Sequence, residues 1–134
     1  MITRDLQVDT SRVSVVDITS AAADLCRESG GDGLLSVFVP HATAGLALME
    51  TASGSESDLV EALQRLLPRD DRYAHAHGSA GHGADHLLPA LVSPSVVIPV
   101  QDGRMQLGTW QSVVLVDLNR DNPRRTVRLS FLRG

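Results

Sequence analysis

Residues 112–132, SVVLVDLNRDNPRRTVRLSFL, hold the two apolar patterns that decide the fold. Residues 112–118 are apolar on both faces of an extended chain, which predicts a strand that is covered on two sides. After a turn, Val127, Leu129 and Phe131 alternate with polar neighbours, which is typical of a strand with one buried face. Because so short a chain has little material for covering both faces, we expect a neighbouring subunit to cover part of residues 112–118.

Further β-rich stretches surround this pair along the chain. Residues 34–39 are largely apolar on both faces, so we expect a strand there that is either central or buried on both sides. Residues 2–8 and 12–17 are β-branched and close in sequence, which predicts an N-terminal hairpin. The remaining predicted strands lie within residues 41–50, 95–100 and 104–107.

The first helical pattern lies between the predicted hairpin and the strand expected at residues 34–39. It follows Thr19 or Ser20 as a cap, ends at Gly30 and carries Cys26 on its apolar stripe. Buried thiols are usually inert, so we expect Cys26 to be a core residue rather than a nucleophile.

Two more helices are predicted in the middle of the chain. One follows a capping box at residues 53–56 and ends at Pro68, and the other, at residues 86–92, should be limited to one or two turns by Pro89. The long glycine-rich stretch between them is typical of a functional loop. The 134 residues therefore predict one α+β domain, residues 1–134, with about two or three short helices.

The composition excludes several functions. All twelve basic residues are arginine, so Schiff-base lysines and the lysine of a phosphate-binding P-loop are absent. A net charge of −4 without a basic tract argues against nucleic acid as a partner. No stretch approaches the roughly 20 apolar residues of a membrane span, and the N-terminus does not resemble a signal peptide. We therefore expect a cytoplasmic protein with no membrane partner, consistent with its single cysteine.

Histidines are the main candidates for chemistry, because imidazole serves both as a metal ligand and as an acid or base near neutral pH. All five fall within 46 consecutive positions, and two pairs have chelating spacing, His75-x-His77 and His82-x-x-x-His86. For any one of them, an exposed or structural role is an equally good interpretation.

His41 differs from the others because it directly follows a predicted buried strand. That position places its imidazole at the end of a sheet, where Thr43 and backbone amides could meet an anionic ligand. Glu50 could orient a histidine or bind a cation, or it could be a surface acid beside a helix.

Two candidate ligand contacts lie near the C-terminus. Trp110 could stack on a heteroaromatic ligand, although large aromatic residues more often pack in a core or an interface. Arg124 and Arg125 could clamp a phosphate, although paired arginines after a turn are more often solvated.

Taken together, these motifs resemble the YjbQ family, also called the secondary thiamine-phosphate synthase family. The matching residues, in family order, are HATAGLALME at 41–50, Tyr73-x-His75, His86-Leu87, Ser93-Pro94-Ser95, Pro99-Val100, Asp102-Gly103-Arg104, LGTWQ at 107–111 and Pro123-Arg124-Arg125. The sequence departs from the family pattern at residues 82–85, HGAD, where many members have an Asn-Ala-Asp-type stretch. This departure either adds His82 to the site or leaves it in solvent.

The resemblance implies an α+β fold built on a two-sheet β-sandwich, a homotrimer and a metal-capable site. The residues that correspond to metal ligands are His41, His75 and His86, with zinc as the first choice of ion and magnesium or nickel as alternatives. His77 and His82 are auxiliary candidates. The family's activity is a weak thiamine-phosphate synthesis, which joins hydroxymethylpyrimidine diphosphate to thiazole phosphate and releases pyrophosphate.

The enzyme hypothesis gives each remaining candidate a role. It assigns catalysis to His41, His86 and Glu50, and binding of a small phosphorylated substrate to Thr43, Trp110, Gln111 and Arg125. The alternatives are a homotrimer that binds a metal or ligand without turnover, or a metal-dependent hydrolase with a different substrate.

Overall fold

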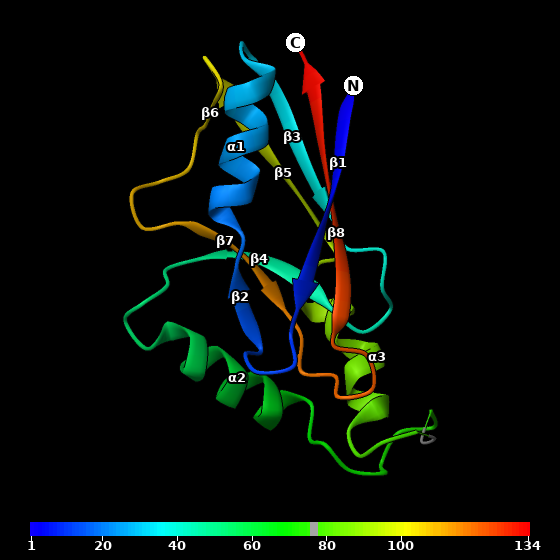
Figure 1. Cartoon of the computed structure of the whole chain (residues 1–134). Coiled ribbons are helices and arrows are strands. Elements are labelled where there is room, and N and C mark those ends of the chain that lie inside the picture. Colours follow the sequence, from blue (N-terminus) through cyan, green and yellow to red (C-terminus); the bar gives the residue numbers. More distant parts are fainter. Residues whose placement is uncertain (76–77) are drawn as a thin grey trace.

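Two antiparallel sheets and three helices make up the fold of the computed structural model, which describes residues 1–75 and 78–134 (Figure 1). The larger sheet contains, in spatial order, β1 (Ile2–Asp9), β8 (Arg124–Arg133), β3 (Gly33–Phe38), β5 (Ser95–Gln101) and β6 (Arg104–Met105). The smaller sheet contains β2 (Val15–Asp17), β7 (Ser112–Val116) and β4 (Gly45–Met49). The helices are α1 (Thr19–Ser29), α2 (Ser55–Leu66) and α3 (His82–Leu91). The predicted α+β fold with a two-sheet β-sandwich is confirmed.

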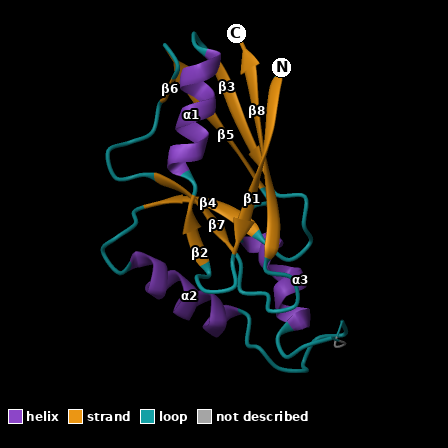
Figure 2. Ribbon diagram, in the orientation of Figure 1, coloured by secondary structure: helices purple, strands orange, loops and turns teal. Residues whose placement is uncertain are grey.

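The core has two parts, one on each side of the smaller sheet. The main cluster joins the inner faces of both sheets to the apolar stripe of α1, including Cys26. The second cluster packs the other face of the smaller sheet against α2 and α3 (Figure 2). Cys26 is fully buried, as predicted, and burial raises the pKa of its thiol.

Strand β7 is buried on both faces, as its sequence predicts, but the cover comes from the same chain. Val113 and Leu115 face the main cluster, whereas Val114 and Val116 face the helices. The expectation that a neighbouring subunit covers this strand is therefore wrong, because α2 and α3 cover the face that α1 and the larger sheet leave open.

The predicted N-terminal hairpin is wrong. Strand β1 pairs with β8 in the larger sheet, whereas β2 pairs with β7 in the smaller one. Residues 10–14 cross between the sheets and are held by two backbone hydrogen bonds, from Thr10 to the carbonyl of Pro123 (2.9 Å) and from Asp117 to the carbonyl of Ser14 (2.8 Å). Sequence proximity suggested the pairing, but the longer β8 offers β1 eight paired positions.

Strand β3 is central, as predicted, because it lies between β8 and β5. Only one of its faces is buried, so of the two alternatives the central position holds and burial on both sides does not. Leu34 and Phe38 lie on the outer face of the larger sheet, with Val97 and Leu132 on the neighbouring strands, and these four side chains are 39% to 58% exposed. We call these four residues the open apolar face.

Helix α3 is longer than the one or two turns predicted. It begins at His82, after Gly81 in the left-handed conformation (φ 86°), and Pro89 lies inside it. Proline removes the hydrogen bond to the carbonyl four residues earlier and crowds that carbonyl, but the packing of Leu88 in the second core cluster offsets this local cost. His82 and His86 therefore lie one turn apart on the same side of a helix. No helix among the described residues is both long and apolar enough to cross a bilayer.

Candidate functional site

Three histidines meet where α3 begins. His82 and His86 come from the helix, and His75 comes from the loop that precedes it. The ring centroids are 4.8 Å apart for His75 and His82, 4.4 Å for His75 and His86, and 4.5 Å for His82 and His86. One ligand nitrogen from each ring lies within 4.8 Å of the other two. We call this group the histidine cluster.

Gly83 explains how the loop comes so close to the helix. A Cβ atom at this position would lie 2.5 Å from the carbonyl oxygen of His75 and 2.7 Å from the Cβ of Tyr73. The loop is further fixed by the Tyr73 hydroxyl, which donates a hydrogen bond to the carbonyl of Pro68 (2.7 Å). A glycine that looks like a helix breaker in the sequence thus allows His75 to join the two helical histidines.

His82 has a carboxylate partner on a distant turn. Its Nδ1 lies 3.0 Å from Oδ2 of Asp121. Hydrogen bonds from Ser79 and from His82 hold the pKa of Asp121 below its usual value, so this carboxylate is ionised at neutral pH. A carboxylate bound to one ring nitrogen fixes the tautomer and leaves the other nitrogen, Nε2, as the one suited to coordination.

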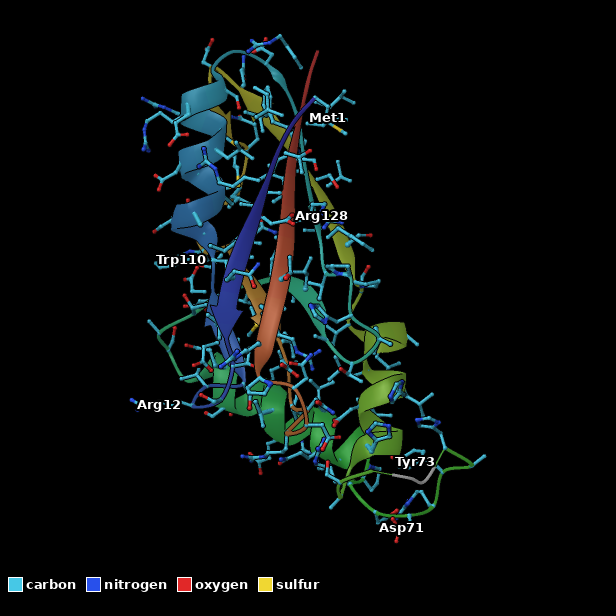
Figure 3. The ribbon with its side chains drawn as sticks, turned by 45° about the vertical axis from the view of Figure 1, so that its right-hand side comes forward. Met1, Arg12, Asp71, Tyr73, Trp110 and Arg128 are labelled. Atoms are coloured by element: carbon cyan, nitrogen blue, oxygen red, sulfur yellow. The ribbon has the colours of Figure 1, made fainter. Side chains whose placement is uncertain are left out.

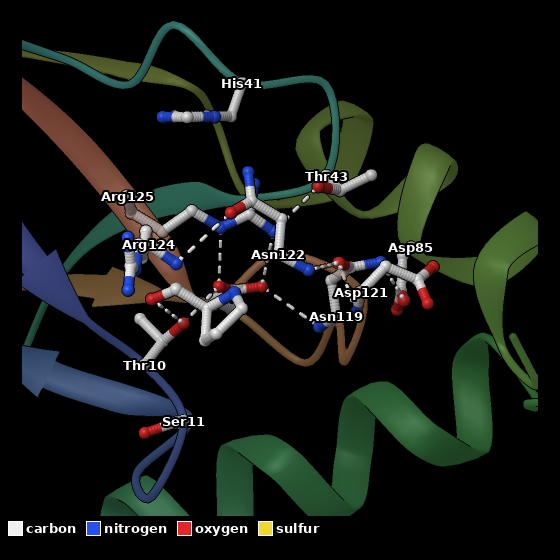
Figure 4. Close-up of polar contacts among 12 residues, drawn as sticks. Thr10, Ser11, His41, Thr43, Asp85, Asn119, Asp121, Asn122, Arg124 and Arg125 are labelled. Atoms are coloured by element: carbon white, nitrogen blue, oxygen red, sulfur yellow. Dashed lines mark hydrogen bonds and ion pairs between the residues drawn. The ribbon is translucent and has the colours of Figure 1, made fainter.

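A buried carboxylate between the two helical histidines locks α3 to the same turn. Asp85 forms an ion pair with Arg69 and accepts a hydrogen bond from Nδ2 of Asn119 (2.9 Å). The side-chain oxygen of Asn119 in turn accepts from the backbone N–H groups of Asp121 and Asn122, each at 3.0 Å. The backbone that carries Asp121 is therefore fixed relative to the helix that carries His82 (Figure 4).

His41 lies apart from this cluster. Its Nε2 accepts a hydrogen bond from the backbone N–H of Thr126 (3.0 Å), at the start of β8. Burial, and then the nearby charge of Arg125, lower the pKa of His41 from 6.5, so the ring is neutral at physiological pH. Of the three expected metal ligands, the structure thus brings His75 and His86 together, and His82 rather than His41 completes the group.

Arg125 and Thr43 belong to a buried polar network. Arg125 donates to both carboxylate oxygens of Asp117, from Nε at 2.7 Å and from Nη2 at 3.0 Å, and Nη2 also donates to the hydroxyl of Thr43 (2.8 Å). The hydroxyl of Thr10 donates to Asp117 as well (2.6 Å). Arg125 and Asp117 are both about 1% exposed, so this pair joins β8 to the end of β7 instead of facing a substrate.

The other expected site residues lie away from the histidine cluster. Glu50 is exposed and accepts a hydrogen bond from the hydroxyl of Ser53 (2.7 Å). Trp110 is 73% exposed, and Figure 3 shows it on a different part of the molecule from Tyr73. The side-chain oxygen of Gln111 accepts from the backbone N–H of Gly108 (2.8 Å) and so stabilises a turn. His77 lies outside the described residues.

Sequence reasoning missed four residues that organise this region: Asp85, Asp117, Asn119 and Asp121. Asp117 had one usable signal, since it interrupts a run of apolar residues at the end of a buried strand. A charged residue there needs a buried partner of opposite charge. No comparable pattern distinguishes Asp121 from an ordinary turn residue.

Comparison with known proteins gives one consistent result. Residues 4–134 match the family model described as "UPF0047 protein YjbQ-like". The UPF0047 protein Rv2556c of Mycobacterium tuberculosis is 66% identical over 129 residues, which cover 96% of each chain. The crystal structure of the hypothetical protein APE1520 from Aeropyrum pernix is 35% identical, with a TM-score of 0.89 over all of both chains. A YbjQ-like protein of unknown function from Sulfolobus solfataricus, at 24% identity, shares the fold with a TM-score of 0.91 over 99% of this chain and 97% of that one. The chain therefore belongs to the UPF0047 YjbQ-like family.

Proposed function

We propose that this protein binds a divalent transition metal ion, with zinc as the first choice, through His75, His82 and His86. The observation that carries the proposal is the histidine cluster itself, in which three imidazoles offer ligand nitrogens within 4.8 Å of one another. Three neutral imidazoles form a typical ligand set for zinc in sites that keep a fourth position open.

The geometry is close to what a metal would need. With bonds of 2.0–2.1 Å and tetrahedral angles, two ligand nitrogens stand about 3.4 Å apart. The widest pair in the cluster therefore has to close by up to about 1.4 Å, which small rotations of the side chains can supply. Imidazole donors suit zinc, nickel or copper, whereas magnesium prefers oxygen ligands. The donor set thus favours zinc or nickel over magnesium.

The polar groups around the cluster support the same proposal. Asp121 holds His82 through Nδ1, and such carboxylate–histidine pairs commonly orient metal ligands. Asp85 does not compete for the ion, because Arg69 and Asn119 occupy its oxygens. An ion bound by three histidines would supply an activated water or a Lewis acid at its open position. A hydrolytic or transfer reaction of a small substrate is the chemistry that such a site would serve.

Metal binding can be tested on protein purified without a histidine tag. Isothermal titration of the metal-free protein with Zn²⁺ should give one site per chain, and His86→Gln should weaken it by more than about 100-fold, beyond what loss of an outer partner costs. His41→Gln is the matched control and should bind like the wild type, because His41 lies outside the cluster. Equal loss in both variants, or no binding by the wild type, would overturn the assignment.

Thiamine-phosphate synthesis is the reaction that the family resemblance adds to this proposal. Release of pyrophosphate from hydroxymethylpyrimidine diphosphate and thiazole phosphate should then depend on the metal and fall in His86→Gln. Turnover that survives both metal removal and this substitution would place the reaction elsewhere. Metal binding without any release of pyrophosphate would indicate a protein that binds the metal without turnover, or a hydrolase that acts on another substrate.

A homotrimer also belongs to this proposal. Exposed apolar side chains that gather on one face of a sheet are typical of an interaction site, and the open apolar face runs across β3, β5 and β8. Other copies of the chain are the occupants we infer for it, because the family resemblance implies a trimer.

A further inference from the structure

The turn that carries Asp121 also lines part of a pocket. The pocket has a volume of about 160 Å³ and is formed where residues 10–14 run alongside residues 117–123. Its lining is largely polar and includes Arg12, Arg120, Ser11 and Ser14. We propose that this pocket binds a small phosphate-class oxyanion, either inorganic phosphate or the phosphoryl group of a small metabolite. The proposal is independent of the metal site.

The arginines at the pocket differ from most others in the chain. Within residues 1–75 and 78–134, the guanidinium groups of Arg12 and Arg120 make no ion pair and no hydrogen bond. They come from the two segments that line the pocket, Arg12 from residues 10–14 and Arg120 from residues 117–123. Asp9 is the acidic group near Arg12, but its carboxylate accepts hydrogen bonds from Ser11, which are the main cause of its lowered pKa. Two unpaired guanidinium groups across one pocket form a typical arrangement for binding an oxyanion.

The one acid in the pocket lining does not cancel this charge. Asp117 is buried, and its two oxygens accept hydrogen bonds from Arg125, Thr10 and the backbone N–H of Asn119. Counting the Asp117–Arg125 pair as neutral, the pocket has a net charge of about +2 from Arg12 and Arg120. An anion entering it therefore meets two guanidinium groups, of which Arg12 also interacts electrostatically with the nearby Asp9.

The walls are fixed before any ligand arrives. The hydrogen bonds from Thr10 to Pro123 and from Asp117 to Ser14 tie the two segments together at both ends of the pocket. Among the described residues, the hydroxyl of Ser14 makes no hydrogen bond, so it can serve as a donor to an oxyanion. A rigid frame with available donors reduces the entropy lost on binding.

The size of the pocket selects the ligand. The pocket volume of 160 Å³ is well below the roughly 300–1,000 Å³ of pockets that hold drug-sized ligands. It corresponds to the volume of several water molecules, at about 30 Å³ each. A single phosphoryl group therefore suits the pocket better than a whole nucleotide does.

Isothermal titration of the metal-free protein tests the proposal with inorganic phosphate, and then with glycerol 3-phosphate, as probes. Arg12→Gln and Arg120→Gln should each weaken binding at least about tenfold, within the range for charged hydrogen bonds. Arg104→Gln is the matched control, because Arg104 is an exposed arginine outside the pocket whose side chain is likewise unpaired in the described structure.

The outcomes separate the pocket from general charge effects. Tighter binding of glycerol 3-phosphate would indicate a phosphomonoester, and equal or weaker binding would indicate free phosphate. No binding by the wild type, or the same loss in all three variants, would overturn the proposal. Because no metal is present in this titration, its failure would say nothing about the histidine cluster.

Discussion

At the scale of single residues, the distinguishing feature is a charged partner placed against one nitrogen of a histidine. Asp121 contacts Nδ1 of His82 at 3.0 Å, while its own backbone is fixed by Asn119 and, through it, by Asp85. The histidine is thus held in one tautomer and orientation before any ion binds. This arrangement resembles the outer-shell carboxylates that tune metal-ligating histidines.

Removing the charge of Asp121 should weaken the metal site without destroying it. We expect Asp121→Asn to reduce zinc affinity by about 10- to 100-fold, the usual cost of losing such a partner. Isothermal titration would measure the zinc affinity. The control is Asp71→Asn, which changes another exposed acid in the same way. Wild-type affinity in Asp121→Asn would show that the carboxylate does not position the ligand.

His41 makes the stability of the fold depend on pH. Its neutral ring accepts a hydrogen bond from Thr126, and its pKa in the folded protein lies below 6.5. As the pH falls, the unfolded chain therefore takes up this proton first. The stabilisation is complete above about pH 6.5 and is lost as the pH falls from there through the lower folded-state pKa.

The corresponding experiment compares urea unfolding between pH 7.5 and 5.0 for the wild type and His41→Gln. The loss of stability on acidification should be smaller in the variant, because it lacks this titrating ring. Parallel pH profiles for the two proteins would mean that His41 does not contribute.

The sequence predicted that histidines would form the site, but it predicted only in part which histidines come together in the histidine cluster. His82 and His86 have helical spacing in the sequence, yet glycines lie on both sides of His82, and glycine disfavours the interior of a helix. The structure uses those glycines differently, one as the left-handed cap and the other as the point where His75 approaches. Asp121 could not be found, since 39 residues separate it from His82 and only the fold brings them together.

At the scale of elements, the buried Arg125–Asp117 pair connects the two sheets. Asp117 follows β7 of the smaller sheet, and Arg125 lies in β8 of the larger one. Thr10, which follows β1, donates to the same carboxylate. The pair therefore fixes the region where strands of both sheets and the crossing segment 10–14 converge.

Breaking this pair should be strongly destabilising. Asp117→Asn leaves the buried guanidinium of Arg125 without a counter-charge, and we expect a loss of about 3–5 kcal/mol in the free energy of unfolding. The control is Asp5→Asn, which breaks the solvent-screened pair with Arg128 on the surface and should change the free energy of unfolding far less. Similar losses measured by urea unfolding in the two variants would contradict the role given to Asp117.

Strand identity was easier to predict than strand pairing. Alternation in residues 125–132 and the two apolar faces of 112–118 correctly indicate β8 and β7. The hairpin of residues 2–8 and 12–17 failed because periodicity describes which faces are apolar and not which strand is the partner. The length of α3 was underestimated because packing of Leu88 outweighs the local cost of Pro89.

At the scale of the whole molecule, the described part of the chain leaves one face of the larger sheet without a covering layer. Helices α2 and α3 cover the smaller sheet, and α1 and the smaller sheet cover one face of the larger sheet. The opposite face carries Leu34, Phe38, Val97 and Leu132. Sequence reasoning expected subunit contacts at β7, whereas the uncovered surface is on β3 and its neighbours.

This surface predicts the assembly of the protein. Light scattering after size exclusion should give a trimer for the wild type, and Val97→Asp should shift it toward monomers because a carboxylate in the contact would be desolvated. Gln101→Asp, an exposed position near the end of the same strand, is the control and should remain a trimer. A monomeric wild type would contradict the assembly.

Anomalous diffraction at the zinc edge tests the central claim most directly. Crystals of untagged protein grown with zinc should show one strong peak per chain, about 2.1 Å from a ring nitrogen of each of His75, His82 and His86. A peak bound by His41, or no peak at the histidine cluster, would contradict the account.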